Sequence, residues 1–214
     1  MNKKPICYLV GAGEYHGMSF FPVPDDFIVA VDDGLTYLKK YCATPDLIVG
    51  DFDSLPEPPN PDEHTVALPR EKDDTDMAAA VREGWVRGFR VFHIFGGTGG
   101  RLDHTLANIQ LLSDIAVKGG CGFLFDKDTV ITAIHNATIT FSAMAQGVVS
   151  VFSHTDTSTG VYERGLKYSL TNAMLHSTQP LGISNEFTGA PSSISVESGT
   201  LIIIYPNTVQ EECS

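Results

Sequence analysis

The sequence predicts two domains of different fold class: an α/β domain with a mostly parallel sheet, followed by an all-β antiparallel sandwich. In residues 1–125, short apolar runs alternate with stretches of helical periodicity, which is typical of a parallel sheet covered on both faces. After residue 125 the helical periodicity almost disappears, and short apolar runs are separated by Gly, Pro, Asn and Ser turns. We therefore expect an α/β domain at residues 1–125 and a β-sandwich domain at residues 126–214.

Each element of the first domain follows from its apolar pattern. Continuous apolar runs of strand length predict buried strands at residues 6–10, 27–31, 47–49, 65–68, 91–95 and 122–125. A helix is expected at residues 75–87, where Met77, Val81 and Trp85 recur every fourth residue. A second helix is expected at residues 102–118, where apolar residues share one face. The Pro-rich stretch 55–62 is interpreted as a surface loop between these elements.

The second domain is interpreted as strands alone. The short apolar runs that predict them lie at residues 138–141, 148–152, 168–170, 194–196 and 201–205. Turn-forming residues separate these runs, so we expect hairpin-like connections and antiparallel pairing.

Composition excludes several classes of protein. The chain has 214 residues, a formal charge of −12 and 43% hydrophobic residues, which describes a globular protein with a sizeable core. Its sequence pI of about 4.8 argues against a nucleic-acid-binding protein. The apolar runs are of strand length, far short of the ~20 residues of a membrane span.

A cytoplasmic location is the expectation from the N-terminus and the cysteines. Lys3 and Lys4 precede an apolar run at residues 6–10 that is too short for the core of a signal peptide. The four cysteines are scattered without a CxxC pair, which favours reduced thiols over a disulfide framework or a zinc site.

A first pair of acids follows the strand predicted at residues 47–49. Asp51 and Asp53 alternate along the chain, so an extended backbone would direct both carboxylates to one side. Ligands in open α/β sheets sit outside the carboxyl ends of strands, which makes this a candidate cation site. Simple turn chemistry, with Asp and Ser bonding nearby backbone N–H groups, explains the same residues equally well.

A second group of acids directly precedes the helix predicted at residues 75–87. Asp73, Asp74 and Asp76 follow Lys72, and Asp74 or Thr75 could cap the helix. Capping explains one or two of these carboxylates. The remaining acids leave metal or phosphate binding as an equal alternative.

A glycine-rich segment, GGTGGRLDH at residues 96–104, follows a predicted strand and opens a predicted helix. Backbone N–H groups at such a position can bind phosphate, and Arg101 adds a bidentate donor. Asp103 either orients Arg101, holds a cation, or closes a tight turn with it. The glycines at residues 11–17 do not fit GxGxxG, and no GxxxxGK[ST] occurs, which disfavours Rossmann dehydrogenases and Walker-type kinases.

Taken in order, these and further segments closely resemble the thiamine pyrophosphokinase family over nearly the full chain. The matching segments are DG at residues 33–34, PDLIVGDFDS at 45–54, KDDTD at 72–76, GRLDHTLAN at 100–108, GLKY at 165–168 and SNEF at 184–187. Two features depart from the family pattern. Tyr168 stands where some members have Trp, and Leu35 and Tyr37 replace the Gly and Asn of the common DGGAN pattern.

The resemblance implies an N-terminal domain that binds ATP and Mg²⁺, a C-terminal β-sandwich that binds thiamine, and a homodimer with active sites where subunits meet. It implies metal-binding and catalytic roles for Asp51, Asp53 and Asp76, and a catalytic role for Arg101. The implied nucleotide-binding residues are Asp33, Gly34, Lys72, Asp73, Arg101 and Asp103. The implied thiamine-binding residues are Lys167, Tyr168, Ser184 and Asn185.

The expected reaction is transfer of a diphosphate group from ATP to the hydroxyl of thiamine, giving thiamine diphosphate and AMP. Carboxylate-held Mg²⁺ and in-line attack at the β-phosphorus would suffice without a covalent intermediate. Another phosphotransferase on the same scaffold would share the acids but would have no need of residues 165–168 and 184–187. A non-catalytic sensor of thiamine or nucleotide would retain binding residues but lose the metal-binding acids, which are all present.

Overall fold

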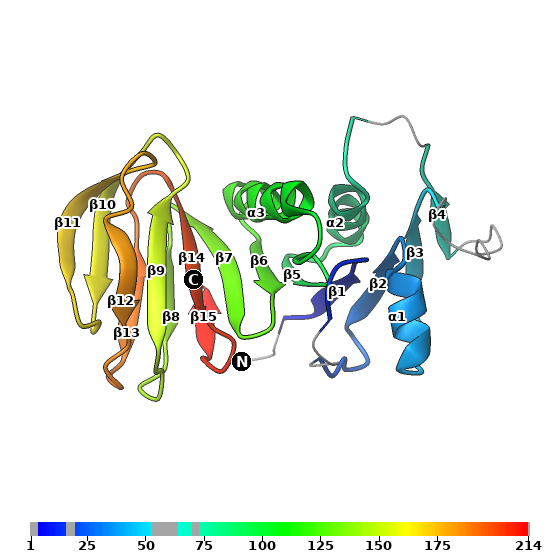
Figure 1. Ribbon diagram of the computed structural model, residues 1–214, viewed down its shortest axis with the longest axis horizontal. Coiled ribbons are helices and arrows are strands. Elements are labelled where there is room, and N and C mark those ends of the chain that lie inside the picture. Colours follow the sequence, from blue (N-terminus) through cyan, green and yellow to red (C-terminus); the bar gives the residue numbers. More distant parts are fainter. Residues whose placement is uncertain (1–3, 16–19, 53–63, 70–72, 214) are drawn as a thin grey trace. The chain divides into compact units, whose positions relative to one another are not determined.

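The computed structural model describes residues 4–15, 20–52, 64–69 and 73–213 (Figure 1). The chain divides into two compact units, Met1–Asn108 and Ile109–Ser214, and helix α3 (Leu102–Val117) crosses this division. The boundary expected between residues 125 and 126 stays a prediction. No helix in the described parts is long and apolar enough to cross a membrane.

Unit 1 is built on a parallel sheet. Its strands are β1 (Ile6–Val10), β2 (Phe27–Val31), β3 (Leu47–Gly50), β4 (Thr65–Ala67) and β5 (Val91–Phe95), in the order β5-β1-β2-β3-β4. Each of the four pairings is parallel. All five residues of β1 are buried, as expected for a central strand with both faces covered.

Two helices cover this sheet on opposite faces. Helix α1 (Gly34–Lys40) leads from β2 to β3, away from β1, whereas α2 (Asp76–Val86) leads from β4 back across the sheet to β5. Right-handed crossovers running in opposite directions place their helices on opposite faces, as Figure 1 shows. Glycine at position 84 lets α2 approach closely, since a Cβ there would lie 2.9 Å from Cys7 Sγ.

Unit 2 is an antiparallel sandwich of two sheets. One has the order β12-β9-β14-β7-β6 and the other β11-β10-β13-β8-β15. The strands of the first sheet are β6 (Cys121–Phe125), β7 (Thr129–His135), β9 (Val148–Ser153), β12 (Gly182–Glu186) and β14 (Thr200–Pro206). Those of the second are β8 (Thr138–Phe141), β10 (Thr157–Arg164), β11 (Leu170–His176), β13 (Ser192–Ser195) and β15 (Glu211–Cys213).

Aromatic and aliphatic side chains from both sheets form the core of unit 2. Phe141 of β8 lies 5.1 Å from Tyr205 of β14, ring centroid to ring centroid, at an interplanar angle of 70°. Such edge-to-face pairs contribute about 0.5–1.5 kcal/mol beyond the area that they bury. The predicted α/β domain followed by an antiparallel sandwich is therefore confirmed.

One predicted strand is wrong. Residues 168–170 do not form a strand of their own, because β11 begins only at Leu170. The backbone N–H and C=O of Tyr168 are bonded instead to the side chain of Asn185, so they are not free for a strand ladder.

Candidate active site

Two glycine-containing loops lie side by side at the carboxyl ends of β1 and β5. Gly11 N donates to Phe95 O at 2.8 Å, Gly13 N donates to Gly96 O at 2.7 Å, and Glu14 N donates to Thr98 O at 3.0 Å. A Cβ at Gly13 would lie 2.3 Å from Thr98 O, so glycine is required for this close approach. The chain leaves β1 toward β2 on one side while β5 lies on the other, which is where open α/β sheets bind ligands.

The start of α1 is packed against the same edge of the sheet. A Cβ at Gly34 would lie 1.8 Å from Val10 O, so packing by itself already requires a glycine at this position of the DG segment. Asp33, the residue before it, is exposed, and its side chain forms no capping hydrogen bond with the helix. Its carboxylate is therefore not used to stabilise α1.

Tyr15 closes the loop that follows β1. Its hydroxyl donates a hydrogen bond to Gly11 O, and its ring stacks on that of Tyr37 with centroids 3.3 Å apart. Burial raises the pKa of Tyr15 well above its ordinary value, with smaller contributions from Tyr37 and Asp33. The phenol therefore stays neutral and keeps its proton for the hydrogen bond to the loop.

The predicted metal-binding acids lie at the same edge of unit 1 as far as they are described. Asp51 follows β3 and is half-buried, and Asp76 is the first residue of α2 and is also half-buried. Asp53 and Lys72 lie outside the described residues. Within the described ranges no three His, Cys, Asp or Glu side chains gather closely enough to hold a metal ion.

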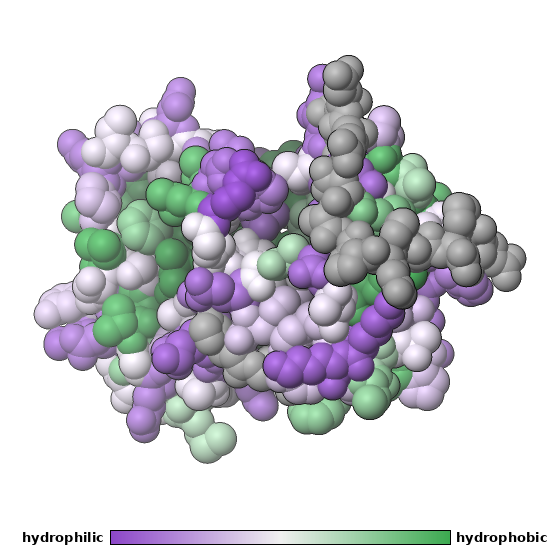
Figure 2. All heavy atoms as spheres, turned by 45° about the vertical axis from the view of Figure 1, so that its right-hand side comes forward, coloured by the Kyte–Doolittle hydropathy of each residue, from purple (hydrophilic) through white to green (hydrophobic). Residues whose placement is uncertain are grey.

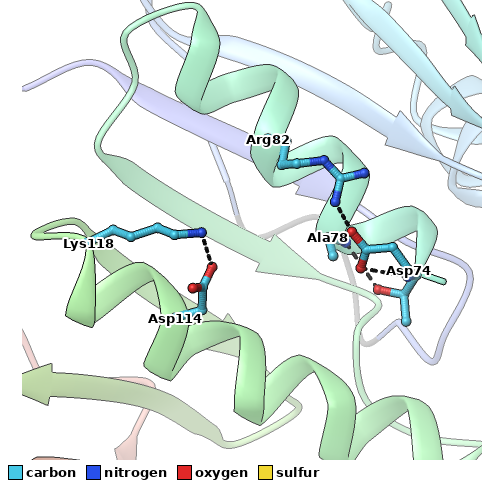
Figure 3. A network of polar contacts seen from close by, with 6 residues as sticks. Asp74, Ala78, Arg82, Asp114 and Lys118 are labelled. Atoms are coloured by element: carbon cyan, nitrogen blue, oxygen red, sulfur yellow. Dashed lines mark hydrogen bonds and ion pairs between the residues drawn. The ribbon is translucent and has the colours of Figure 1, made fainter.

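The acids before α2 differ in their surroundings. Thr75 caps the helix, because its Oγ1 accepts a hydrogen bond from Ala78 N at 3.1 Å. Asp74 accepts from Thr75 N at 2.9 Å and forms an ion pair with Arg82 (Figure 3). Asp73 is exposed. Asp74 and Thr75 therefore organise the helix terminus, while Asp76 begins the helix itself.

Arg101 and Asp103 form a bidentate ion pair at the start of α3. Arg101 Nε donates to Asp103 Oδ1 at 3.1 Å, and Arg101 Nη2 donates to Oδ2 at 2.6 Å. Both side chains are largely exposed, at 71% and 65%. The Arg101 hydrogen bond lowers the pKa of Asp103 to about 2. The pair thus presents a charged guanidinium and a charged carboxylate to solvent.

The side chain of Asn108 anchors the glycine-rich segment before α3. The buried Asn108 Nδ2 donates to Gly97 O at 2.8 Å, while Gly96 O and Thr98 O accept from the loop after β1. Three successive carbonyl oxygens are thus bonded inside unit 1. This anchors the loop whose N–H groups were expected to face phosphate.

In unit 2, the structure brings three of the four predicted thiamine-binding residues together. Tyr168 N donates to Asn185 Oδ1 at 3.0 Å, and Lys167 N donates to Glu186 O at 3.0 Å. Lys167 Nζ forms an ion pair with Glu186 at 2.6 Å and lies 5.5 Å from the centroid of the Tyr168 ring. The Tyr168 side chain is 60% exposed, so its ring is accessible to a ligand.

Ser184 is set apart by an irregularity in β12. Gly182 pairs with Val151 and Asn185 with Val149, so three steps along β12 oppose two along β9. This is a β-bulge, and Ser184 within it has a φ of 58°. The extra residue leaves Ser184 exposed and directs Asn185 to the interior.

Sequence reasoning missed one residue of this group, Glu163 on β10. Its carboxylate is 1% exposed and accepts from Asn185 Nδ2 at 2.6 Å through Oε2. Burial raises the pKa of Glu163, and the hydrogen bond from Asn185 partly opposes this. The only signal in the sequence is an acid two residues after Val161, at an inward position of a strand that was not predicted.

Comparison with known proteins agrees with both halves of the chain. Residues 24–121 match the model for the thiamin pyrophosphokinase catalytic domain, and residues 136–201 match that for the thiamin pyrophosphokinase vitamin B1 binding domain. A thiamine pyrophosphokinase of Bacillus subtilis (strain 168) is 30% identical over 191 residues, which cover 82% of this chain and 85% of the relative.

Solved structures show the same fold. The crystal structure of a thiamin pyrophosphokinase from Geobacillus thermodenitrificans matches with a TM-score of 0.82 and 31% identity, covering 94% of this chain and 97% of that one. A thiamin pyrophosphokinase from Candida albicans matches with a TM-score of 0.74 and 17% identity, covering 95% and 89%. The second likeness concerns the fold alone.

Proposed function

The chain belongs to the thiamin pyrophosphokinase family, and on that premise we propose how its residues divide the work of transferring a diphosphate group from ATP to thiamine. The observation that carries this proposal is the placement of charged residues at one edge of the sheet of unit 1. Asp33, Asp51, Asp76 and the Arg101–Asp103 pair all follow strands or open helices at the carboxyl ends of one parallel sheet. Charged groups at this edge are suited to a nucleotide and its cation.

The carboxylates at this edge fit Mg²⁺ by their chemistry, because hard oxygen ligands are what this cation prefers. Asp51 and Asp76, with Asp53, would hold it. When bound, the cation would neutralise the charge of the phosphates. Asp74 is not in this set, since Arg82 and the backbone of Thr75 occupy its carboxylate.

Phosphate positioning falls to the cationic and glycine-rich residues. Arg101 exchanges its bond to Asp103 for phosphate oxygens, and Lys72 adds a second positive charge. Asp33, Gly34, Asp73 and Asp103 complete the proposed nucleotide site. The paired loops after β1 and β5 are a rigid support for it, because their hydrogen bonds join backbone to backbone.

Unit 2 supplies the proposed thiamine site. The exposed ring of Tyr168 offers a face to the cationic thiazolium or the pyrimidine, with Lys167 Nζ 5.5 Å from the ring centroid, and the exposed Ser184 completes the proposed site. The hydroxyl oxygen of thiamine attacks the β-phosphorus, the bond from that phosphorus to the α-phosphate oxygen breaks, and AMP leaves. The hydroxyl proton passes to one of the aspartates.

The nucleotide product tests this function directly. We expect purified protein incubated with ATP, Mg²⁺ and thiamine to form thiamine diphosphate and AMP in equal amounts, and chelation of the cation to stop the reaction. ADP as the sole nucleotide product would indicate a monophosphate transferase instead. Absence of any product that depends on thiamine would refute the proposed function.

A cytoplasmic homodimer is the proposed state of the enzyme. The scattered cysteines support the cytoplasmic location. The dimer is supported by apolar side chains exposed on unit 2, namely Val148, Met174, Leu181 and Ile183. Figure 2 shows one face of the molecule, on which apolar residues in green stand among polar ones in purple. Neither nucleic acid nor membrane is a proposed partner.

A further inference from the structure

The side-chain amide of Asn185 has all of its hydrogen-bonding capacity used within the protein. Its Oδ1 accepts from Tyr168 N at 3.0 Å and from Glu186 N at 2.9 Å. Its Nδ2 donates to Tyr168 O and to Glu163 Oε2, both at 2.6 Å. An amide offers two donor hydrogens and two acceptor positions, so none remains for a ligand.

The orientation of this amide is fixed. Two backbone N–H groups point at Oδ1, so a flipped amide would set its own hydrogens against theirs. Asn185 is also 4% exposed, whereas Ser184 beside it is exposed. A residue that is buried and fully bonded cannot meet thiamine as a polar ligand without breaking bonds that it already makes.

Glu163 completes the arrangement from the other sheet of unit 2. It lies on β10 and accepts from Asn185 on β12, so this bond joins the two sheets. A Cβ at Gly182 would lie 3.3 Å from Glu163 Oε1, so a glycine here leaves room for the carboxyl group. Glu163 thereby determines which way the donor side of Asn185 faces.

What this arrangement holds is the backbone of Tyr168. Both its N–H and its C=O are bonded to one side chain, while its ring remains 60% exposed. We propose that Asn185 and Glu163 are positioning residues that fix Tyr168 for thiamine and do not bind thiamine themselves. This rests on the proposed function, in which Tyr168 contacts the substrate.

A double-mutant cycle tests the proposal. We expect Asn185→Ala and Tyr168→Ala each to raise KM for thiamine by about 10-fold, with KM for ATP nearly unchanged, since a ring-face contact has a comparable strength. The double variant should resemble Tyr168→Ala alone, because Asn185 acts through that ring. If the two effects on KM for thiamine multiply instead, Asn185 contacts thiamine independently and the proposal is wrong.

Further variants separate positioning from stability. Asn207→Ala is the matched control, because Asn207 Nδ2 also holds a backbone carbonyl of unit 2, Lys127 O, at 2.7 Å. It should lower the resistance to urea without changing KM for thiamine. Should Asn185→Ala fail to fold, Asn185→Ser keeps a small polar side chain at this buried position, and the same cycle applies.

Glu163 gives an independent arm of the test. Glu163→Leu removes the acceptor and should raise KM for thiamine as Asn185→Ala does, whereas Glu163→Gln retains an acceptor and should return KM toward the wild-type value. A folded Glu163→Leu enzyme with unchanged KM for thiamine would contradict the proposal. A wild-type enzyme that forms no thiamine diphosphate refutes the proposed function. An active wild-type enzyme in which the effects of Asn185→Ala and Tyr168→Ala on KM for thiamine multiply refutes this inference alone.

Discussion

Asp51 and Asp76 carry the clearest prediction at the scale of single residues. Asparagine keeps their shape but removes the charge proposed to hold Mg²⁺, so Asp51→Asn and Asp76→Asn should each lower kcat for AMP formation by about 100-fold or more. Circular dichroism should be unchanged, because asparagine serves well in turns and at helix starts.

Asp114→Asn is the control for these variants. Asp114 of α3 forms an exposed ion pair with Lys118, the residue after the end of this helix, 2.6 Å apart (Figure 3), and such pairs contribute little. Its kcat should equal that of the wild type. Near wild-type turnover in both Asp51→Asn and Asp76→Asn would mean that these carboxylates serve only local structure.

The Arg101–Asp103 pair makes a second prediction at this scale. The hydrogen bond from Arg101 lowers the pKa of Asp103 to about 2, so its carboxylate stays charged to strongly acid pH. In Arg101→Ala the pKa should rise toward the ordinary value of about 3.9. Carbon-detected NMR titration of the Asp103 carboxyl measures both values. A titration that is the same in both proteins would show that the pair does not persist in solution.

At the scale of elements, the start of α2 depends on Thr75. Its Oγ1 accepts from Ala78 N, and losing such a cap costs about 1 kcal/mol. Thr75→Ala should therefore lower the free energy of unfolding by about that amount in urea, whereas Thr75→Ser should lower it far less. Equal losses in both variants would mean that the methyl group, and not the hydroxyl, provides the stability.

How well an element could be predicted depended on where its apolar residues lie. The runs of β1 and β2 are apolar throughout, and that of β5 is interrupted only by His93, so they indicate strands without ambiguity. Strand β10 was missed because Ser158 and Glu163 occupy inward positions, where hydropathy alternation expects apolar side chains. Helix α1 was missed because seven residues are too few to show a helical period.

The candidate site was likewise only partly predictable from the sequence. Acids next to strand ends are visible in sequence, since topology alone carries them to one edge of a sheet. The pairing of the loops after β1 and β5 is not visible, because it joins backbone atoms of residues far apart in the chain. The role of Asn185 is hidden for the same reason: its side chain bonds to the backbone of Tyr168, seventeen positions away.

At the scale of the whole molecule, we predict a homodimer. Light scattering should give twice the chain mass of 23.1 kDa. Ile183→Lys and Met174→Lys should shift the protein toward the monomer, because both are exposed on strands at sheet edges of unit 2. Val86→Lys, at an exposed position of unit 1, is the control and should stay dimeric. A wild-type chain that remains a fully active monomer would overturn this prediction.

The bulge in β12 constrains how this segment can change in evolution. Side chains alternate between the two faces of a strand, so without the bulge Asn185, three residues after the buried Gly182, would face outward. Point substitutions at Ile183 leave that alternation intact. Chain length and bulge are therefore coupled in this segment: a lineage keeps Asn185 inward without the bulge only if it also loses one residue between Gly182 and Asn185.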